Sequence, residues 1–391
     1  MKAPMTLSRD TKIIAMGVLL CVCGSGPFYV MPNYLQSAVH DFGLSSSQIG
    51  LLSGAEGLGI ASACVATGLL ARRLNWIAVL VCAAVCALGN ALIVYAHGFG
   101  PILAVRTVCG LAGEGPLYAM SYMLLGSAGN PDRAFGVAIT ALAVFSAVAL
   151  HFERALYGAL GAGGILVPFA ALAVVVVGLI IRSRSLDLRP QGAAPDLRRG
   201  PRWDAVVILL SIGVWSCGPG AFWPFSEAAA VVMGVSAPVI AQALSASLLV
   251  GLLGAALPAV IGDRFGRLVP VTLATAIAGM SVVMFFAHRD LFSLTAALSL
   301  LQFSWNLAVV YQLAGLAVVD PHGRYSALGA VSQFGGIAVG PVVAGWVTQG
   351  AGYPSLVVIV AGFVAVGWGL FVAGQRLGRS GAAVTVERKT A

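Results

Sequence analysis

The chain has 391 residues, of which 59% are hydrophobic and only 9% are charged, and its mean hydropathy is +0.95. Soluble domains carry about 25% charged residues, so this composition excludes a water-soluble enzyme and indicates an integral membrane protein. The formal charge of +8 does not indicate a nucleic-acid partner, because the Lys and Arg residues fall where membrane topology places them.

Twelve apolar stretches of about 20 residues follow one another along nearly the whole chain. A helix needs this length to cross about 30 Å of hydrocarbon, and the runs lack the alternation of a barrel strand. We therefore predict an all-α membrane protein with 12 transmembrane helices. The expected spans are residues 12–36, 47–70, 76–96, 99–127, 133–154, 159–181, 204–227, 236–261, 268–287, 290–318, 326–349 and 354–377.

The stretches form two copies of a six-span unit, the second displaced by 191 positions. Such a duplication is typical of transporters whose two halves move about a site held between them. It divides the chain into an N-terminal bundle (1–181), a linker (182–203), a C-terminal bundle (204–377) and a tail (378–391). The residues that recur at this offset are Gly43 and Gly234, Ser45 and Ser236, Ile49 and Ile240, Ala55 and Ala246, Arg73 and Arg264, His97 and His288, and Arg133 and Arg324.

The distribution of basic residues predicts the orientation. Of the 22 Lys and Arg residues, all but Arg106, Arg154 and Arg289 lie at the N-terminus, in the turns after spans two, four, eight and ten, in the linker or in the tail. Because basic loops stay in the cytoplasm, we expect both termini to be cytoplasmic, in a multi-pass protein of the cell inner membrane. The Pro- and Arg-rich linker is expected to be a tether, with lipid binding or regulation as the alternative.

The Cys and His residues give no sign of metal or redox chemistry. The seven cysteines lie in apolar helices without a CxxC pair, and the five His residues are scattered. Buried Cys packs as a small hydrophobe, so we expect no metal site and no other cofactor. The chain also lacks a GxxxxGKS or GxxxxGKT nucleotide-binding loop.

The short loops carry the most specific motifs. The segment Gly262-Asp263-Arg264-Phe265-Gly266-Arg267, between spans eight and nine, resembles the GDRxGR signature loop of the major facilitator superfamily. Its counterpart at 68–75 departs from the pattern, with Arg72 in place of the acidic residue and Asn75 in place of a glycine. The resemblance implies that loops of this kind latch neighbouring helices together in one conformation. The expected latch residues are Asp263, Arg264, Arg267, Arg73, Arg133 and Arg324.

Span four adds a second resemblance to the same family. The stretch from Arg106 to Gly115 is similar to the family's RxxxGxxxG motif, and the loops 130–133 and 320–324 look like its equivalent short loops. With the twelve spans and the central linker, the resemblance covers essentially the whole chain. It implies two pseudo-symmetric six-helix bundles around a central cavity, working as a monomer.

Glycine patterns in two other spans are informative. Exporters driven by proton antiport often carry a GxxxGPxxGG motif in span five, and no glycine occurs here between Gly136 and Gly158. The nearest form lies in span eleven, at 336–345, where we expect a packing seam or a hinge. Gly50 and Gly54 form a GxxxG pair that fits contacts within the chain and between chains equally well.

A few charged residues fall inside the spans, where each costs roughly 2.5–3.5 kcal/mol and needs a partner or a task. Glu56 and Arg106 lie at similar depths in spans two and four, and span four also contains Glu114. In one interpretation Arg106 binds a carboxylate of the substrate while Glu56 or Glu114 takes up a proton. In the other, Arg106 and Glu56 form a permanent ion pair. Three further charged residues are expected to be solvated at helix ends: Glu153, Arg154 and Glu227.

By analogy with the family, spans one, four, seven and ten are expected to line the cavity. The candidates are aromatic and amide side chains, which together with one Arg suit an organic or aromatic acid better than a sugar. The expected substrate-binding residues are Arg106, Tyr29, Asn33, Tyr118, Tyr122, Trp215, Trp223, Trp305, Asn306, Tyr311 and Gln312.

These observations predict a secondary active transporter that moves a small organic solute by alternating access, with protons as the coupling ion in symport. Its partners are the solute, protons and the lipid bilayer. Proton-coupled efflux of hydrophobic compounds is the alternative within transport. A polytopic membrane enzyme is the alternative class, and it would need an acid, base or metal cluster at one membrane face, which the sequence does not show.

Overall fold

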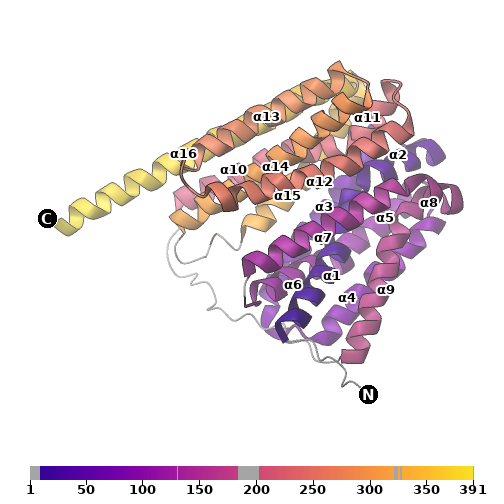
Figure 1. Ribbon diagram of the computed structural model, residues 1–391, viewed down its shortest axis with the longest axis horizontal. Helices are drawn as coiled ribbons and strands as arrows, with labels where there is room; N and C mark the ends of the chain where they lie inside the picture. The colour runs from indigo at the N-terminus through magenta and orange to yellow at the C-terminus, as the bar shows by residue number, and fades with distance from the viewer. Residues whose placement is uncertain (1–8, 130, 184–201, 321–324, 326–327, 391) are drawn as a thin grey trace.

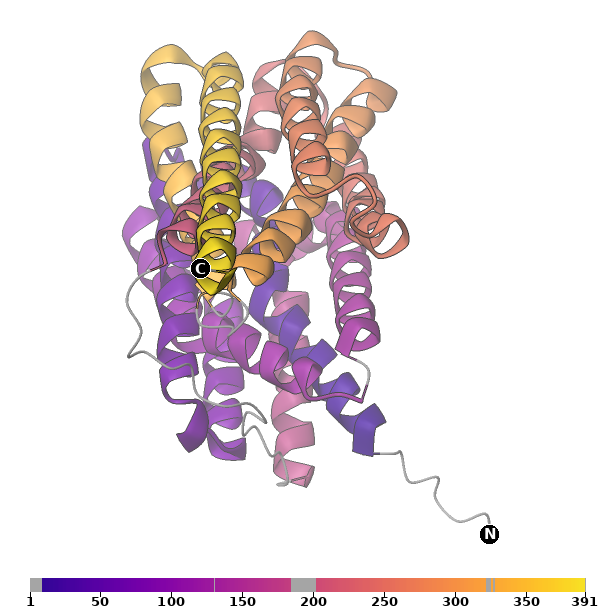
Figure 2. The ribbon, with the colours of Figure 1, turned by 90° about the vertical axis from the view of Figure 1, so that its left-hand side faces the viewer.

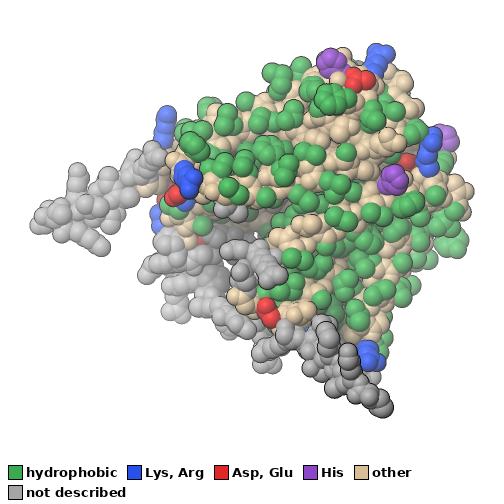
Figure 3. All heavy atoms as spheres, in the orientation of Figure 1, with side chains coloured by type: hydrophobic (Ala, Val, Ile, Leu, Met, Phe, Trp, Pro, Cys, Tyr) green, Lys and Arg blue, Asp and Glu red, His purple; other side chains and the backbone are tan. Residues whose placement is uncertain are grey.

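The computed structural model describes residues 9–129, 131–183, 202–320, 325 and 328–390, and the regular structure in these residues is entirely helical. Eleven of the described helical segments are long and apolar enough to cross a membrane, and they fall at eleven of the expected spans. Figure 3 shows hydrophobic side chains spread over the flanks of the molecule, as expected for a surface that faces lipid.

The N-terminal half contains the first six expected spans. Span one is followed by a short helix, and span six is preceded by short helices. The apolar pattern did not separate these short helices from the spans. The helices are α1 (Arg9–Tyr29), α2 (Met31–Phe42), α3 (Ser46–Leu69), η1 (Ala71–Arg73), α4 (Trp76–Leu92), η2 (Ile93–Tyr95), α5 (Phe99–Val108), η3 (Cys109–Glu114), α6 (Gly115–Gly126), α7 (Pro131–His151), α8 (Glu153–Leu160), η4 (Ala162–Leu166) and α9 (Val167–Ser183).

The C-terminal half repeats this order with longer uninterrupted helices. Its last helix continues to Thr390 through the segment expected as a tail, and Figure 1 shows it projecting beyond the bundle. The helices are α10 (Trp203–Phe222), η5 (Trp223–Phe225), α11 (Ser226–Val232), α12 (Ala237–Ile261), α13 (Leu268–Ala287), α14 (Leu291–Val319), α15 (Gly329–Ala351), η7 (Tyr353–Ser355) and α16 (Leu356–Thr390).

The expected fourth span is built differently from the other eleven. It consists of α5, the π-helical turn η3 and α6. The backbone stays right-handed at both junctions, with φ and ψ of −58° and −49° at Cys109 and of −60° and −49° at Gly115. The three segments therefore run on as one helix that contains a π turn. The count of twelve spans stays a prediction, because this helix is not among the eleven continuous apolar ones.

The internal repeat is visible in the backbone. Gly43 and Gly234 have φ of 64° and 85° just before α3 and α12, and glycine enters this left-handed region without the strain of a side chain. Gly161 and Gly352, with φ of 69° and 74°, form another left-handed pair at the same offset of 191, and each precedes a 3-10 turn. The chain therefore makes the same turns at equivalent points of both halves.

The two bundles touch most closely where α3 packs on α15 and α7 packs on α12. The α3–α15 seam depends on glycine: a Cβ atom on Gly50 would lie 2.3 Å from the backbone oxygen of Pro341, and one on Gly345 would lie 2.6 Å from that of Ser46. The Gly50 and Gly54 pair thus joins the two halves of one chain. The other face of α15 packs on α10 through Gly336 and Gly340.

The molecule has two unlike ends. At one end α2 packs against η5 and α11 of the other half, and we call this the closed end. At the other, where α1 begins and α16 approaches its end, the bundles diverge, and we call this the terminal end (Figures 1 and 2). One hydrophobic core cluster includes residues of both bundles, and a second lies among α1, α4, α6 and α9.

Candidate functional site

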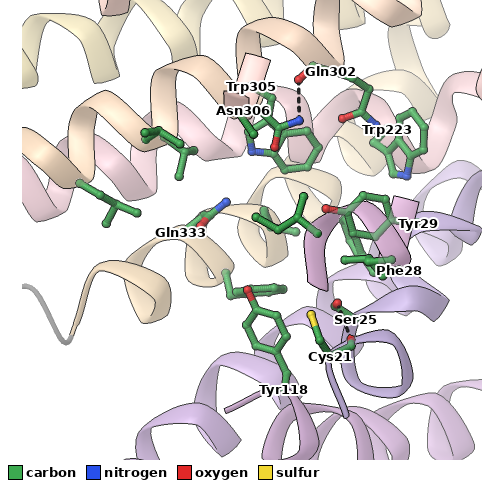
Figure 4. Close-up of a pocket in the computed structure, with 18 of the residues that line it drawn as sticks. Cys21, Ser25, Phe28, Tyr29, Tyr118, Trp223, Gln302, Trp305, Asn306 and Gln333 are labelled. Atoms are coloured by element: carbon green, nitrogen blue, oxygen red, sulfur yellow. Dashed lines mark hydrogen bonds between the residues drawn. The ribbon is translucent and has the colours of Figure 1, made fainter. Parts of the chain in front are cut away.

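A cavity of about 200 Å³ lies between the two halves (Figure 4). Helices α1, α6 and α7 of the N-terminal half face η5, α12, α14 and α15 of the C-terminal half across it. Its lining residues are Cys21, Ser25, Phe28, Tyr29, Tyr118, Tyr122, Ile139, Leu142, Trp223, Ala255, Gln302, Trp305, Asn306, Val309, Val310, Leu313, Gln333, Phe334 and Ile337. None of these side chains carries a charge.

One face of α14 supplies three of the polar side chains. Gln302, Trp305 and Asn306 recur at helical spacing, so they point to the same side. The amide nitrogen of Asn306 donates to the backbone oxygens of Gly251 at 3.1 Å and of Gln302 at 2.9 Å, which leaves its side-chain oxygen for a ligand. The indole nitrogen of Trp305 is buried without a hydrogen-bond partner. Gln333 adds another amide from α15.

The N-terminal half contributes an aromatic wall. The hydroxyl of Tyr118 donates to that of Tyr122 at 2.6 Å, and the ring of Tyr118 lies 5.0 Å from that of Phe334, edge to face. Phe28 and Tyr29 complete the wall from α1 (Figure 4). The cavity therefore offers aromatic rings from both halves, side-chain amides from the C-terminal half and hydroxyl groups from the N-terminal half.

Six of the expected substrate-binding residues line this cavity: Tyr29, Tyr118, Tyr122, Trp223, Trp305 and Asn306. The others lie elsewhere. Trp215 donates to the hydroxyl of Thr275, Tyr311 donates to the backbone oxygen of Gly262, and Gln312 donates to the hydroxyl of Ser211. Asn33 is buried towards the closed end, and Arg106 belongs to a separate buried cluster.

Family analogy missed the contributions of α7, α12 and α15, because it considered only spans one, four, seven and ten. Ile139 and Leu142 on α7 and Ala255 on α12 are apolar, and nothing in their local sequence separates them from residues that face lipid. Gln302 carried a usable signal. It lies three and four residues before Trp305 and Asn306, so the helical period places it on the same face.

Arg106 forms the centre of a buried polar cluster. Its Nε donates to Oε2 of Glu56 at 2.7 Å, and its Nη1 donates to Oδ1 of Asn90 at 2.7 Å. Its Nη2 donates to Glu56 as well and lies 3.1 Å from Oε1 of Glu114. The amide of Asn90 in turn donates to Glu114 at 3.3 Å. All four side chains are buried, and all the nitrogens of the guanidinium are occupied within the cluster.

Close helix packing holds this cluster together. A Cβ atom on Gly110 would lie 2.6 Å from the backbone oxygen of Glu56, and one on Gly113 would lie 2.9 Å from the backbone nitrogen of Cys86. The turn η3 begins directly after α5 and ends at Glu114, so it positions the second carboxylate beside Arg106. Turns of the π type are rare and occur frequently at functional sites.

The charges in this cluster do not balance. It contains two carboxyl groups and one guanidinium, and Arg106 is the one basic side chain that is buried among the described residues. A buried charge without a partner is strongly unfavourable. A proton on one of the two carboxyl groups would make the cluster neutral.

The expected latch residues have few contacts at the terminal end. Arg73, Asp263 and Arg264 are exposed, and none of them forms an ion pair within the described part of the chain. Arg267 is partly buried and also has no ion pair there. Arg324 and the side chain of Arg133 lie outside the described residues. Their role in a latch stays a prediction.

The expectation that Glu153 and Glu227 are solvated at helix ends is wrong. Their exposed fractions are 7% and 2%, because both lie at the closed end where the two halves meet. Arg154 is exposed as expected.

Several solved structures that are similar to this chain are those of transporters. The crystal structure of the nucleoside transporter NupG aligns with a TM-score of 0.71 and 13% identity, over 95% of this chain and 99% of that chain. A point mutant of NupG aligns with a TM-score of 0.73 over 93% and 99%. A bacterial homolog of the human lysosomal transporter Spinster, inward-facing and occupied, aligns with a TM-score of 0.65 and 14% identity, over 96% of both chains.

No protein-family profile and no curated protein matches the sequence. The structural likeness extends over nearly the whole chain, and the eleven apolar helices show a multi-pass membrane protein. The likeness confirms the fold that the resemblance to the major facilitator superfamily implied.

Proposed function

We propose that this protein is a secondary active transporter, rather than an enzyme, that carries a small uncharged aromatic solute together with a proton. The observation that supports this most directly is the cavity between the bundles, which aromatic rings from both halves and amides from the C-terminal half line. Its volume of about 200 Å³ is below the range of about 300–1,000 Å³ typical for drug-sized ligands, which favours a small solute.

The lining favours an uncharged solute over an organic acid. An anion would need a cation or several donors to replace its hydration, and the lining contains no charged side chain. Arg106, which the sequence offered as a carboxylate anchor, has its donors occupied by Glu56, Asn90 and Glu114. Nucleosides and nucleobases have the planar ring and uncharged polar edge that this cavity suits, and NupG, which has the same fold, is a nucleoside transporter.

Proton coupling would use the cluster around Arg106. One proton on Glu56 or Glu114 neutralises it, and loss of that proton leaves a net negative charge in a buried site. The cluster joins α3, α4, α5 and η3, so a change in its charge would alter the packing of α3, the helix that also forms the seam with α15. Proton binding would thereby influence the angle between the two bundles.

The divergence of the bundles at the terminal end supports alternating access. With both termini in the cytoplasm, as the basic loops predict, the closed end would face outward and this conformation would be open inward. The seam between α3 and α15 would then be one line about which the bundles rock.

Uptake into proteoliposomes tests the proposal. The purified chain would be offered uridine, a free nucleobase and benzoate under imposed pH gradients. We expect accumulation of an uncharged compound with acid outside, and none of benzoate. Gln302→Leu in the cavity should reduce uptake, whereas Gln242→Leu, at an exposed position of α12 outside the cavity, should not.

The alternative outcomes are distinct. Uptake of benzoate alone would overturn the uncharged solute, and accumulation with acid inside would show antiport and therefore favour export. No uptake under any gradient would overturn transport of these solute classes.

A further inference from the structure

Two carboxyl groups from opposite halves are buried at the closed end. Glu153 begins α8 in the N-terminal half, and Glu227 lies in α11 of the C-terminal half. The charge of Glu153 acts on Glu227 across the interface. Helix α2 contacts α11 and η5, and Figure 1 places α2, α8 and α11 at this same end. The two acids therefore lie at the end where the bundles would have to separate to open the closed end.

The hydrogen bonds of this group are incomplete. Oε2 of Glu153 and Oε2 of Glu227 are buried without a partner. Asn33 of α2 is fully buried and faces Glu153, yet its amide is outside hydrogen-bonding geometry, so neither its oxygen nor its nitrogen has a partner. Each unsatisfied buried group costs about 1–3 kcal/mol. An amide can donate to a carboxylate and accept from a carboxylic acid, so Asn33 suits a site whose protonation changes.

The surrounding charges do not neutralise the pair. Arg154 is exposed on α8 and only partly offsets the charge of Glu153, while Glu153 is the one charged group that acts on Glu227. His40 and Asp41 of α2 are bonded to Tyr157 of α8 in a separate, exposed group. Two carboxylates in this position would repel each other across the interface.

We propose that Glu153 and Glu227 hold one proton between them, beside Asn33, and that this proton keeps the closed end shut. When both carboxyl groups are ionised, their repulsion favours separation of the bundles at this end, and the proton leaves to the water that enters. This site is distinct from the cluster around Arg106, and its proposed role needs no solute. The proposal can therefore be tested independently of the proposed function.

The sign of the pH dependence follows from burial. Burial raises the pKa of Glu153 above its ordinary value in the closed conformation, while in the open conformation water restores that value. The closed conformation thus binds the proton more tightly. It is favoured at low pH and loses that advantage as the pH rises through the raised pKa.

The reactivity of a buried reporter cysteine tests the proposal. Ala230 is fully buried in α11, close to Glu227, and none of the seven native cysteines is exposed. The full chain with Ala230→Cys would be treated in lipid nanodiscs with a membrane-impermeant maleimide. Val232→Cys, at a position that is 73% exposed, gives the reference rate. Dividing by this rate corrects for the direct effect of pH on the reactivity of a thiol. The measured quantity is the ratio of the two rates.

We expect this ratio to rise about tenfold between about pH 5.5 and about pH 8.5. In the double variant Glu153→Gln/Glu227→Gln it should change by less than about twofold, because no ionisable carboxyl group remains at this site, while each single Gln variant should keep a smaller pH dependence because the remaining buried carboxyl group meets no repulsion. Asp290→Asn is the matched control: it removes an exposed carboxylate that caps α14, Asn caps equally well, and the pH dependence should persist.

Three results would overturn the proposal. The first is a ratio that does not depend on pH in the chain with both acids, which is decisive even if neither Gln variant folds. The second is an unchanged pH dependence in the double variant Glu153→Gln/Glu227→Gln. The third is a ratio that follows sodium concentration at constant pH, which would assign the two acids to a metal cation.

Discussion

Arg106→Lys separates the two roles that the sequence allowed for this residue. Lysine keeps the positive charge but loses the planar fork that reaches Glu56 and Asn90 at once. The ammonium can stay with the carboxylates, so the oxygen of Asn90 is left buried and unpaired. That loss costs about 1–3 kcal/mol, and the loss of one charge-assisted bond adds to it. We expect a destabilisation of about 2–4 kcal/mol and a fall in the unfolding midpoint on the order of 5 °C.

Binding should hardly change in the same variant, because Arg106 does not line the cavity. Thermal unfolding in detergent gives the stability. Quenching of tryptophan fluorescence gives the dissociation constant for the best solute of the uptake panel, since Trp223 and Trp305 line the cavity. We expect the constant to stay within about twofold. A tenfold loss of affinity at unchanged thermal stability would refute this reasoning and restore Arg106 as a substrate anchor.

Three further changes have defined outcomes. Gly50→Leu should lower thermal stability and uptake, because its Cβ would collide with the backbone of Pro341. Gly68→Leu lies on the same helix with open space around it, so it should leave both quantities unchanged in the same assays. Trp305→Phe removes an unpartnered indole donor, so it should leave the stability of the free protein intact and weaken solute binding about tenfold in the quenching assay. Burial raises the pKa of Asp41, but its hydrogen bonds lower this pKa by more. The stabilisation that ionised Asp41 contributes is therefore lost as the pH falls below about 4. Asp41→Asn should reduce this acid dependence of the unfolding midpoint.

The sequence predicted the fold well because hydrocarbon thickness sets the length of each span and duplication sets their order. It did not separate α2, α8 or α11 from the neighbouring spans. These short helices at the closed end depend on contacts with the other half, such as that of α2 with α11, and not on local apolar periodicity. The burial of Glu227 was missed for the same reason, since a helix end is solvated only when no other bundle covers it.

The cavity was predicted in part. Tyr29, Tyr118 and Trp305 were found because they are aromatic residues on the spans expected to line the cavity. Predicting the direction in which such a side chain points requires the exact helical phase. Tyr311 illustrates the problem: it follows Trp305 by six residues, which is about 240° around an α-helix, so the two point to different sides. The pairing of Glu56 with Arg106 was expected from their similar depth and from the family's neighbouring of spans two and four, whereas the parts played by Glu114 and Asn90 required the structure.

The π turn η3 has no counterpart in α14, which is an uninterrupted helix. Glu114 and Trp305 are separated by the offset of 191, yet the acid lies inside its own bundle while the indole faces the cavity. The wider winding of η3 changes the helical phase, so equivalent positions of the two duplicated helices face different surroundings. Under the proposed function, substitutions on α14 would alter which compound is accepted without disturbing the buried charges, so selectivity could diverge among relatives while the proton-binding cluster is left as it was.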